Sequence, residues 1–256
     1  MFIARKLMPL AAASILLAAC GNNDRDNAVL TVPDTPATRA VAEEIRQQNE
    51  RREKAAQARE AEAKAPTANP STPLDSYVEL RGEAQLMQAY YALSGLPVPW
   101  DRLASAVSND FRNTHDSFAR QEILNVLKPR LEEEIAGFAK NRYIMIPTRV
   151  GLNAYDFERK GFPMRGFEPG SFLSFGNSGY VLAYGNSDQF RFAPVGEETL
   201  ARDIEGVRAN RPYGEYRARV YAFARHAADD AGRYTVKAQI VKVVVEKPDG
   251  SAWFEF

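Results

Sequence analysis

One group of side chains has the types and spacing that acid–base catalysis needs. The group consists of Asp101, Asp110, His115 and Asp116. A histidine paired with a carboxylate can transfer protons near neutral pH, as in a hydrolase-type enzyme. Aspartate near a helix start more commonly caps the helix, and these residues lie where one predicted helix ends and the next begins. We therefore expect capping and exposed charge, and keep the enzyme as a third functional hypothesis.

Metal and cofactor chemistry finds little support in the sequence. The chain has two histidines, His115 and His226, and a single cysteine. This supply gives none of the ligand spacings that are typical of zinc, copper or haem sites. The glycines at positions 161, 166 and 170 do not form a phosphate-binding loop, because no predicted helix follows them. We expect no metal, no catalytic motif and no cofactor apart from a covalent lipid.

The single cysteine lies at a position where a lipid can be attached. Cys20 follows Leu17-Ala-Ala, and the chain before it has a basic start, Arg5 and Lys6, and an uncharged run of 13 residues, 7–19. A bilayer-spanning helix needs about 20 apolar residues, so the run fits a cleaved signal peptide. This segment resembles the lipobox of bacterial lipoproteins. The alternative is an ordinary signal peptide followed by a chance cysteine.

The resemblance implies a covalent lipid on Cys20 and removal of residues 1–19. A diacylglyceryl group would alkylate the thiol, and the new amino group would then be acylated. One fatty chain binds a bilayer only marginally, whereas two or three chains would hold the protein stably. Gly21 follows the cysteine, where enteric lipoproteins retained at the inner membrane have Asp. The resemblance therefore implies a bacterial cell-envelope protein anchored in the outer membrane and facing the periplasm, with the membrane as partner.

The charge balance argues against nucleic-acid binding. The chain has 33 basic and 33 acidic side chains, and loss of residues 1–19 removes only Arg5 and Lys6, which leaves a net charge of −2. Proteins that bind nucleic acid need an excess of basic side chains to neutralise phosphates. We expect no nucleic-acid partner.

Residues 20–74 are expected to tether a folded domain to this anchor. Residues 37–65 are rich in Ala, Glu, Arg, Gln and Lys, which favour helix, and pairs such as Glu60 and Lys64 lie four residues apart. Because only two of these residues are large and apolar, the helix has no face to bury. It is either a solvent-exposed spacer or a partly disordered charged linker, and a Pro-rich linker follows it. Deleting residues 37–65 should leave the domain folded.

The globular domain is expected to span residues 75–256, with helices over residues 77–140. Apolar side chains recur at helical spacing from Tyr77 to Ser94, and Gly95 suits the C-cap of that helix. Two more helices are predicted before residue 140. Pro129 falls inside the last one. The helix either kinks there or ends at Leu127 and restarts with Pro129 at its first helical position, and the second option is favoured.

Residues 142–256 are expected to be mainly strands, because apolar and polar side chains alternate there. The predicted strands cover residues 143–146, 152–157, 180–184, 190–193, 215–225, 233–246 and 251–256, with a loop over 161–170 and a helix over 197–209. Two Gly-Asn-Ser sequences flank the third strand and favour successive hairpin turns. The order of elements predicts an α+β fold. In it, N-terminal helices pack on a curled antiparallel sheet or partly open barrel, with an OB-like barrel as one version.

Two groups of side chains could form a binding face. Phe162 and Phe167 lie in a Gly- and Pro-rich loop, where they either form an exposed surface for a protein partner or pack in the core. Alternation along residues 215–225 places a basic and aromatic set on one face: Arg217, Arg219, Tyr221, Phe223 and Arg225. That face could bind an anionic or sugar-like envelope ligand. The more ordinary interpretation is a solvated sheet face with cross-strand pairs.

Four stretches carry a further likeness. They are Tyr90-Tyr91-Ala92-Leu93-Ser94-Gly95 with Pro97, Leu127-Lys128-Pro129-Arg130, Tyr155-Asp156-Phe157 followed by Lys160-Gly161-Phe162-Pro163, and Val236-Lys237-Ala238-Gln239-Ile240-Val241. They resemble an uncharacterised family of bacterial lipoproteins, a domain of unknown function. The resemblance supports the limits of the domain and supplies no activity or catalytic residues.

These observations favour a lipid-anchored envelope protein with a non-catalytic structural or protein-interaction role in the periplasm. A periplasmic small-ligand binder is the alternative, and an enzyme is the third hypothesis. A pocket lined by the Arg217–Arg225 face would favour the ligand, and an exposed Phe162 and Phe167 surface would favour an envelope protein partner. The enzyme requires His115 within hydrogen-bond reach of a carboxylate in a cleft.

Overall fold

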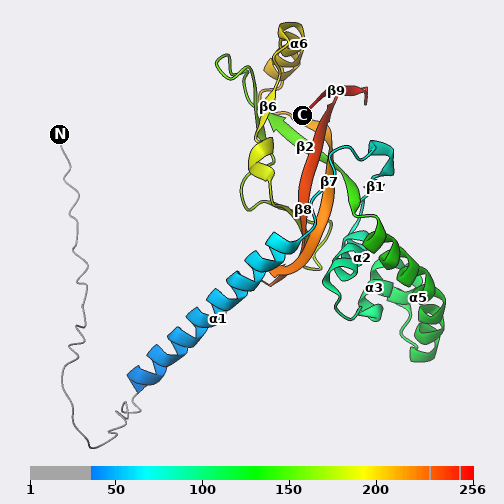
Figure 1. The fold of residues 1–256 in the computed structure, drawn as a ribbon. Coiled ribbons are helices and arrows are strands. Elements are labelled where there is room, and N and C mark those ends of the chain that lie inside the picture. Colours follow the sequence, from blue (N-terminus) through cyan, green and yellow to red (C-terminus); the bar gives the residue numbers. More distant parts are fainter. Residues whose placement is uncertain (1–35, 231, 248) are drawn as a thin grey trace, which may run out of the picture. The chain divides into compact units, whose positions relative to one another are not determined.

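The computed structural model describes residues 36–230, 232–247 and 249–256 (Figure 1). The chain divides into two units after Arg51, and of the first unit only residues 36–51 are described. The boundary falls inside helix α1, Pro36–Lys64, so the last turns of α1 belong to the larger unit. The predicted signal peptide and Cys20 lie outside the described residues.

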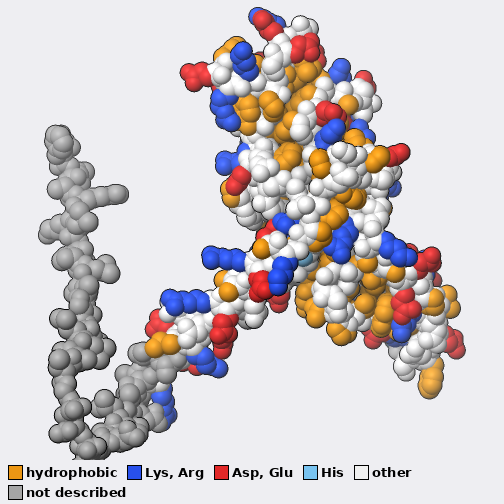
Figure 2. Space-filling model, viewed as in Figure 1, with side chains coloured by type: hydrophobic (Ala, Val, Ile, Leu, Met, Phe, Trp, Pro, Cys, Tyr) orange, Lys and Arg blue, Asp and Glu red, His pale blue; other side chains and the backbone are white. Residues whose placement is uncertain are grey.

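Helix α1 closely matches the charged helix predicted over residues 37–65. Acidic and basic side chains alternate along it (Figure 2), and Arg46 donates to Glu43 at 2.7 Å while Lys64 donates to Glu60 at 2.5 Å. Among its described side chains, all but that of Glu62 are exposed. Helix propensity and side-chain pairs therefore stabilise most of α1, rather than core burial.

Four helices follow and pack together: α2 Glu83–Ser94, α3 Trp100–Val107, α4 Asn109–Asn113 and α5 Ser117–Lys140. Gly95 ends α2 with a φ of 66°, which confirms the predicted C-cap. The Asp116 carboxylate accepts a hydrogen bond from the Ala119 backbone N–H and so caps the start of α5.

Two helix boundaries differ from the prediction. The helix predicted from Tyr77 begins at Glu83, because strand β1, Val78–Glu79, pairs with the sheet first. The break favoured at Pro129 is wrong, since α5 is one helix with this residue inside it, as the alternative had it. Leu131 is fully buried, and Leu127 packs on the same core from the other side of the proline. These contacts hold both halves in one helix despite the missing backbone donor.

The fold is α+β with a curled half-barrel sheet, as predicted (Figure 1). Its longer strands are β2 Tyr143–Leu152, β3 Gly161–Arg165, β5 Tyr180–Tyr184, β7 Glu215–Asp230 and β8 Arg233–Glu246. Shorter strands are β4 Phe172–Leu173, β6 Phe192–Pro194 and β9 Ala252–Glu255, and helix α6 spans Glu198–Ala209. Among the described residues the strand order is β4-β5-β8-β7-β2-β3-β6, with β1 on β2 and β9 on β8.

The sheet is mixed, whereas an antiparallel sheet was predicted. Strand β5 runs parallel to β8, and β1 runs parallel to β2. The Gly-Asn-Ser sequence after β5 therefore makes no hairpin, and instead leads into a 3₁₀ helix, Ser187–Phe190. The strand predicted over 152–157 is also wrong: β2 ends at Leu152, and part of the predicted loop over 161–170 is strand β3. Pairing along β7 from Tyr143 to Gly151 extends β2 through Pro147.

Helix α2 packs on the inner face of this sheet and helps to close the core. Leu86, Met87 and Tyr90 are almost completely buried. The Tyr91 and Tyr180 hydroxyls lie 2.6 Å apart, and the Tyr180 ring stacks on the Tyr234 ring with centroids separated by 4.7 Å. These contacts join α2 to the neighbouring strands β5 and β8, and they leave the opposite, outer face of β7 for other contacts.

Candidate functional site

The basic and aromatic side chains predicted on residues 215–225 lie along the outer face of β7, but in different environments. Arg217 is exposed and Arg219 is half-buried, whereas Tyr221 and Phe223 are only 6% and 8% exposed. The β2–β7 register places four side chains beside them: Tyr143, Met145, Pro147 and Arg149. The predicted binding face is therefore not continuous, because its two aromatic side chains, Tyr221 and Phe223, are buried.

Tyr77 covers the middle of the face. Its ring makes edge-to-face contacts with Tyr221 and Tyr143, at centroid distances of 5.2 and 5.1 Å. Such aromatic pairs contribute about 0.5–1.5 kcal/mol each beyond their burial. Burial raises the pKa of Tyr77 to about 12, so the phenol stays neutral in a packed aromatic cluster. This part of the face is therefore internal to the domain.

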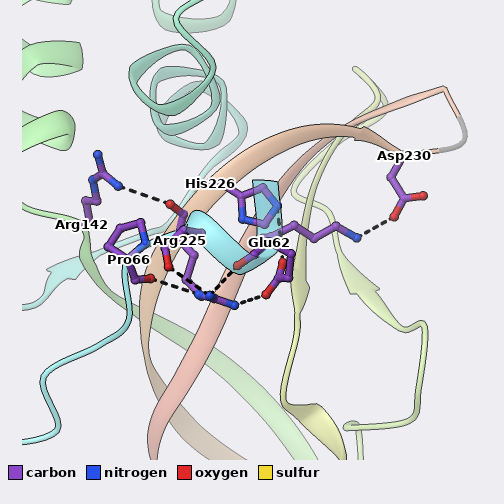
Figure 3. A network of polar contacts seen from close by, with 8 residues as sticks. Glu62, Pro66, Arg142, Arg225, His226 and Asp230 are labelled. Carbon is purple, nitrogen blue, oxygen red and sulfur yellow. Dashed lines mark hydrogen bonds and ion pairs between the residues drawn. The ribbon is translucent and has the colours of Figure 1, made fainter. Parts of the chain in front are cut away.

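The end of the face around Arg225, which we call the lower end, contacts another segment of the same chain, residues 62–80. We call this segment the strap. The Arg225 guanidinium forms an ion pair with Glu62 and donates to the carbonyls of Glu62, Ala65 and Pro66 at 2.9, 3.2 and 3.1 Å (Figure 3). Arg142 in turn donates to the Arg225 carbonyl at 3.3 Å. Arg225 therefore holds the end of α1 against the sheet.

Further along the strap, backbone groups continue the attachment. The Ala68 N–H donates to the Gln239 side chain at 3.2 Å, and the Asn69 N–H donates to the Tyr143 hydroxyl at 2.8 Å. Asn141 donates to the Ser76 carbonyl at 2.9 Å. The folded unit thus includes residues before Asp75, where the sequence placed the start of the domain, because a Pro-rich segment can lie on a sheet without helix or strand structure.

A β-bulge brings a second side chain to Glu62. The β7–β8 register shifts between Ala224 and His226, so Arg225 is the extra residue and both it and His226 reach Glu62. His226 Nε2 lies 3.5 Å from the Glu62 carboxylate (Figure 3). Burial lowers the pKa of His226, an effect that the Glu62 charge opposes and the Arg225 charge reinforces. We call Glu62, Arg225 and His226 the clasp.

At the other end of the face, around Arg217, which we call the upper end, the basic side chains pair with Glu246. Glu246 lies 2.8 Å from Arg219 and 3.8 Å from Arg217, and its side chain is only 15% exposed. Arg149 on β2 lies directly opposite Arg217. This end of β7 is the part of the predicted face that a soluble ligand can still reach.

Phe162 and Phe167 do not form an exposed surface. They are 0% and 1% exposed. The Phe162 ring makes an edge contact with Tyr155 at 5.1 Å, and the Phe167 ring lies 6.3 Å from that of Phe190. Of the two interpretations weighed for this loop, core packing is the one that the burial of both rings fits.

The candidate acid–base residues are not brought together. Asp116 accepts from the Ala119 N–H at 2.8 Å, and the Asp110 carbonyl accepts from the Thr114 hydroxyl at 2.7 Å. His115 and Asp101 are exposed, and within the described part of the chain His115 makes no hydrogen bond to a carboxylate. The geometry that the enzyme hypothesis requires is therefore missing at these positions.

The described residues form neither a metal cluster nor a membrane-spanning helix. Within residues 36–230, 232–247 and 249–256, no three His, Cys, Asp or Glu side chains cluster as metal ligands would. No helix in these ranges combines the length and apolarity needed to cross a bilayer. The predicted lipid attachment at Cys20 lies outside them.

Sequence patterns alone missed Glu62 and Arg149. Glu62 is 163 residues from Arg225, and a charge on an exposed helix gives no indication of such a partner. Arg149 continues the alternation of Met145 and Pro147 along β2, so a longer strand prediction would have placed it beside Arg217.

No protein-family model, curated protein or solved structure matches this chain. The likeness to an uncharacterised lipoprotein family stays a prediction.

Proposed function

We propose that this protein is a lipid-anchored component of the bacterial cell envelope with a non-catalytic structural or protein-interaction role in the periplasm. The observation that carries the proposal is Leu17-Ala-Ala-Cys20 at the end of an uncharged run of 13 residues that is too short to span a bilayer. Fatty chains on Cys20 would anchor the protein, with the outer membrane as the expected site.

The contacts in the larger unit support a role without catalysis. The strap occupies the lower and middle parts of the face that a ligand was expected to use. The acid–base candidates are exposed or cap helices. The ligand-binding alternative keeps its support only at the upper end, near Arg149 and Arg217.

The anchor is tested by replacing the one thiol. In a bacterial host fed an alkyne fatty acid, the full chain should take up the label, lose residues 1–19 and fractionate with membranes. The Cys20→Ser variant should lose the label and keep residues 1–19, because no thiol remains to be alkylated. Intact mass spectrometry reads both changes.

Asn23→Ser, three residues beyond the cysteine, is the matched control and should behave as the native chain. Equal labelling and normal processing of Cys20→Ser would overturn the proposal.

A further inference from the structure

A groove at the upper end of the outer face gathers basic side chains from separate segments. Arg149 from β2, Arg217 from β7, Arg211 from the α6–β7 connection and Lys247 from the β8–β9 connection line it. Its volume is about 640 Å³, in the range of pockets that hold small ligands. We call this site the basic groove.

The basic side chains in the basic groove outnumber its carboxylates, so their charge is only partly balanced. Arg149 and Arg217 are direct partners in the β2–β7 register, and like charges placed opposite one another destabilise a sheet. The Glu246 carboxylate is shared between Arg217 and Arg219, at 3.8 and 2.8 Å. Glu215 is the other acidic side chain in the lining. Within the described residues, Arg149 and Arg211 form no ion pair.

A buried hydroxyl lies beside the basic groove, on a side chain that alternates with Arg217 along β7 and packs in the core. Tyr216 also lines the basic groove and is 8% exposed, and its hydroxyl has no hydrogen-bond partner among the described residues. Burial raises the pKa of Tyr216, while Arg208 and Arg211 nearby oppose the rise. A neutral phenol is a hydrogen-bond donor, and an unsatisfied buried donor is rare in folded proteins.

We propose that the basic groove binds a phosphate-bearing ligand that carries more than one negative charge. Guanidinium groups match phosphate oxygens in pairs, and a bound phosphate would remove the repulsion between Arg149 and Arg217. Two negative charges would offset the excess of four basic side chains over two carboxylates in the lining. The inference does not depend on the lipid anchor, because the residues involved belong to the folded unit alone.

Calorimetric titration of the purified full chain, in a non-ionic detergent, with inorganic pyrophosphate tests the proposal. The native chain should show saturable binding, and Arg149→Gln with Arg211→Gln should weaken it about tenfold or more, through loss of charge-assisted hydrogen bonds. Arg202→Gln is the matched control: it removes one charge from an exposed arginine on α6 that pairs with Glu198 outside the groove. It should change the affinity less than about twofold.

A second measurement keeps folding and binding apart. Without pyrophosphate, Arg149→Gln alone should raise the thermal midpoint, because it removes the like-charge pair with Arg217. Competition by micelles doped with cardiolipin, whose headgroup carries two phosphates, but not with phosphatidylcholine, would identify a lipid headgroup as the source of the phosphate. Pyrophosphate binding without such competition would identify a soluble phosphorylated ligand. No saturable binding up to about 1 mM, or equal weakening by Arg202→Gln, would overturn the proposal.

Discussion

The guanidinium of Arg225 makes all of this residue's contacts with the strap, and a lysine at this position could not make them all. Its planar group offers five N–H donors, and the strap presents a carboxylate and three carbonyls within its reach. A lysine ammonium has three donors and no fixed fork. The clasp therefore depends on the shape of the side chain as well as on its charge.

His226 makes the clasp sensitive to acid. Burial holds the pKa of His226 below its usual 6.5, so folding favours the neutral imidazole. The unfolded chain then binds more protons below pH 6.5, and the stabilisation that is complete above this pH is lost as the pH falls through the folded pKa. We expect the thermal midpoint to fall between pH 7 and pH 5, and His226→Gln to flatten part of this fall.

His115→Gln is the control for this pH effect, because His115 is exposed and far from the clasp in the sequence. Its pH profile of the midpoint should follow that of the native chain. A His226→Gln profile identical to the native one would show that the buried imidazole does not contribute.

Among the elements, helix α5 contains a residue that lowers its stability. Pro129 lies inside the helix, is exposed and lacks the N–H that would complete the backbone ladder. Pro129→Ala should therefore raise the free energy of unfolding by about 1–3 kcal/mol, measured by urea denaturation.

Glu133→Ala, at another exposed position of the same helix, should change stability by less than about 0.5 kcal/mol. A destabilised Pro129→Ala variant would mean that the proline supports a contact that alanine cannot replace.

Local signals in the sequence predicted the positions of helices and strands better than the way in which the strands pair. Gly95 ends a helix because its own backbone allows a positive φ, and the alternation in residues 233–246 is visible without a structure. The Gly-Asn-Ser sequence before β5 does lie in the connection between the antiparallel strands β4 and β5. The parallel pairing of β5 with β8 has no local signature, so the Gly-Asn-Ser sequence after β5 suggested a hairpin that is not there. Likewise, alternation placed the aromatic and basic side chains of β7 on one face, but could not reveal that Tyr77 and the strap cover much of it.

At the scale of the whole molecule, the folded unit begins earlier than its composition suggests. The boundary between the two units lies at residues 51 and 52, and the strap makes hydrogen bonds from Glu62 onward. The Pro-rich linker expected to end at residue 74 is therefore part of the domain in its contacts, although it has little regular structure.

Two truncated chains test this limit. A chain starting at residue 52 should keep the midpoint of the full chain, whereas one starting at residue 75 loses the contacts of Arg225 and Tyr143 with the strap. The second chain should lose about 2–4 kcal/mol of unfolding free energy, as expected for several hydrogen bonds of which one involves a charge pair. Equal stability of the two chains would show that residues 62–74 rest on the sheet without stabilising it.

The central place of β7 and β8 affects when the molecule can fold during its synthesis. The ribosome produces β2 and β5 first, yet both form their long pairings with strands from residues 215–246. Until the β7–β8 hairpin emerges, β2 and β5 lack the strands that lie between them in the sheet. Contacts between segments that are distant in the sequence also form slowly. This delay suits the proposed export, because a chain threaded through a membrane must not fold before it has crossed.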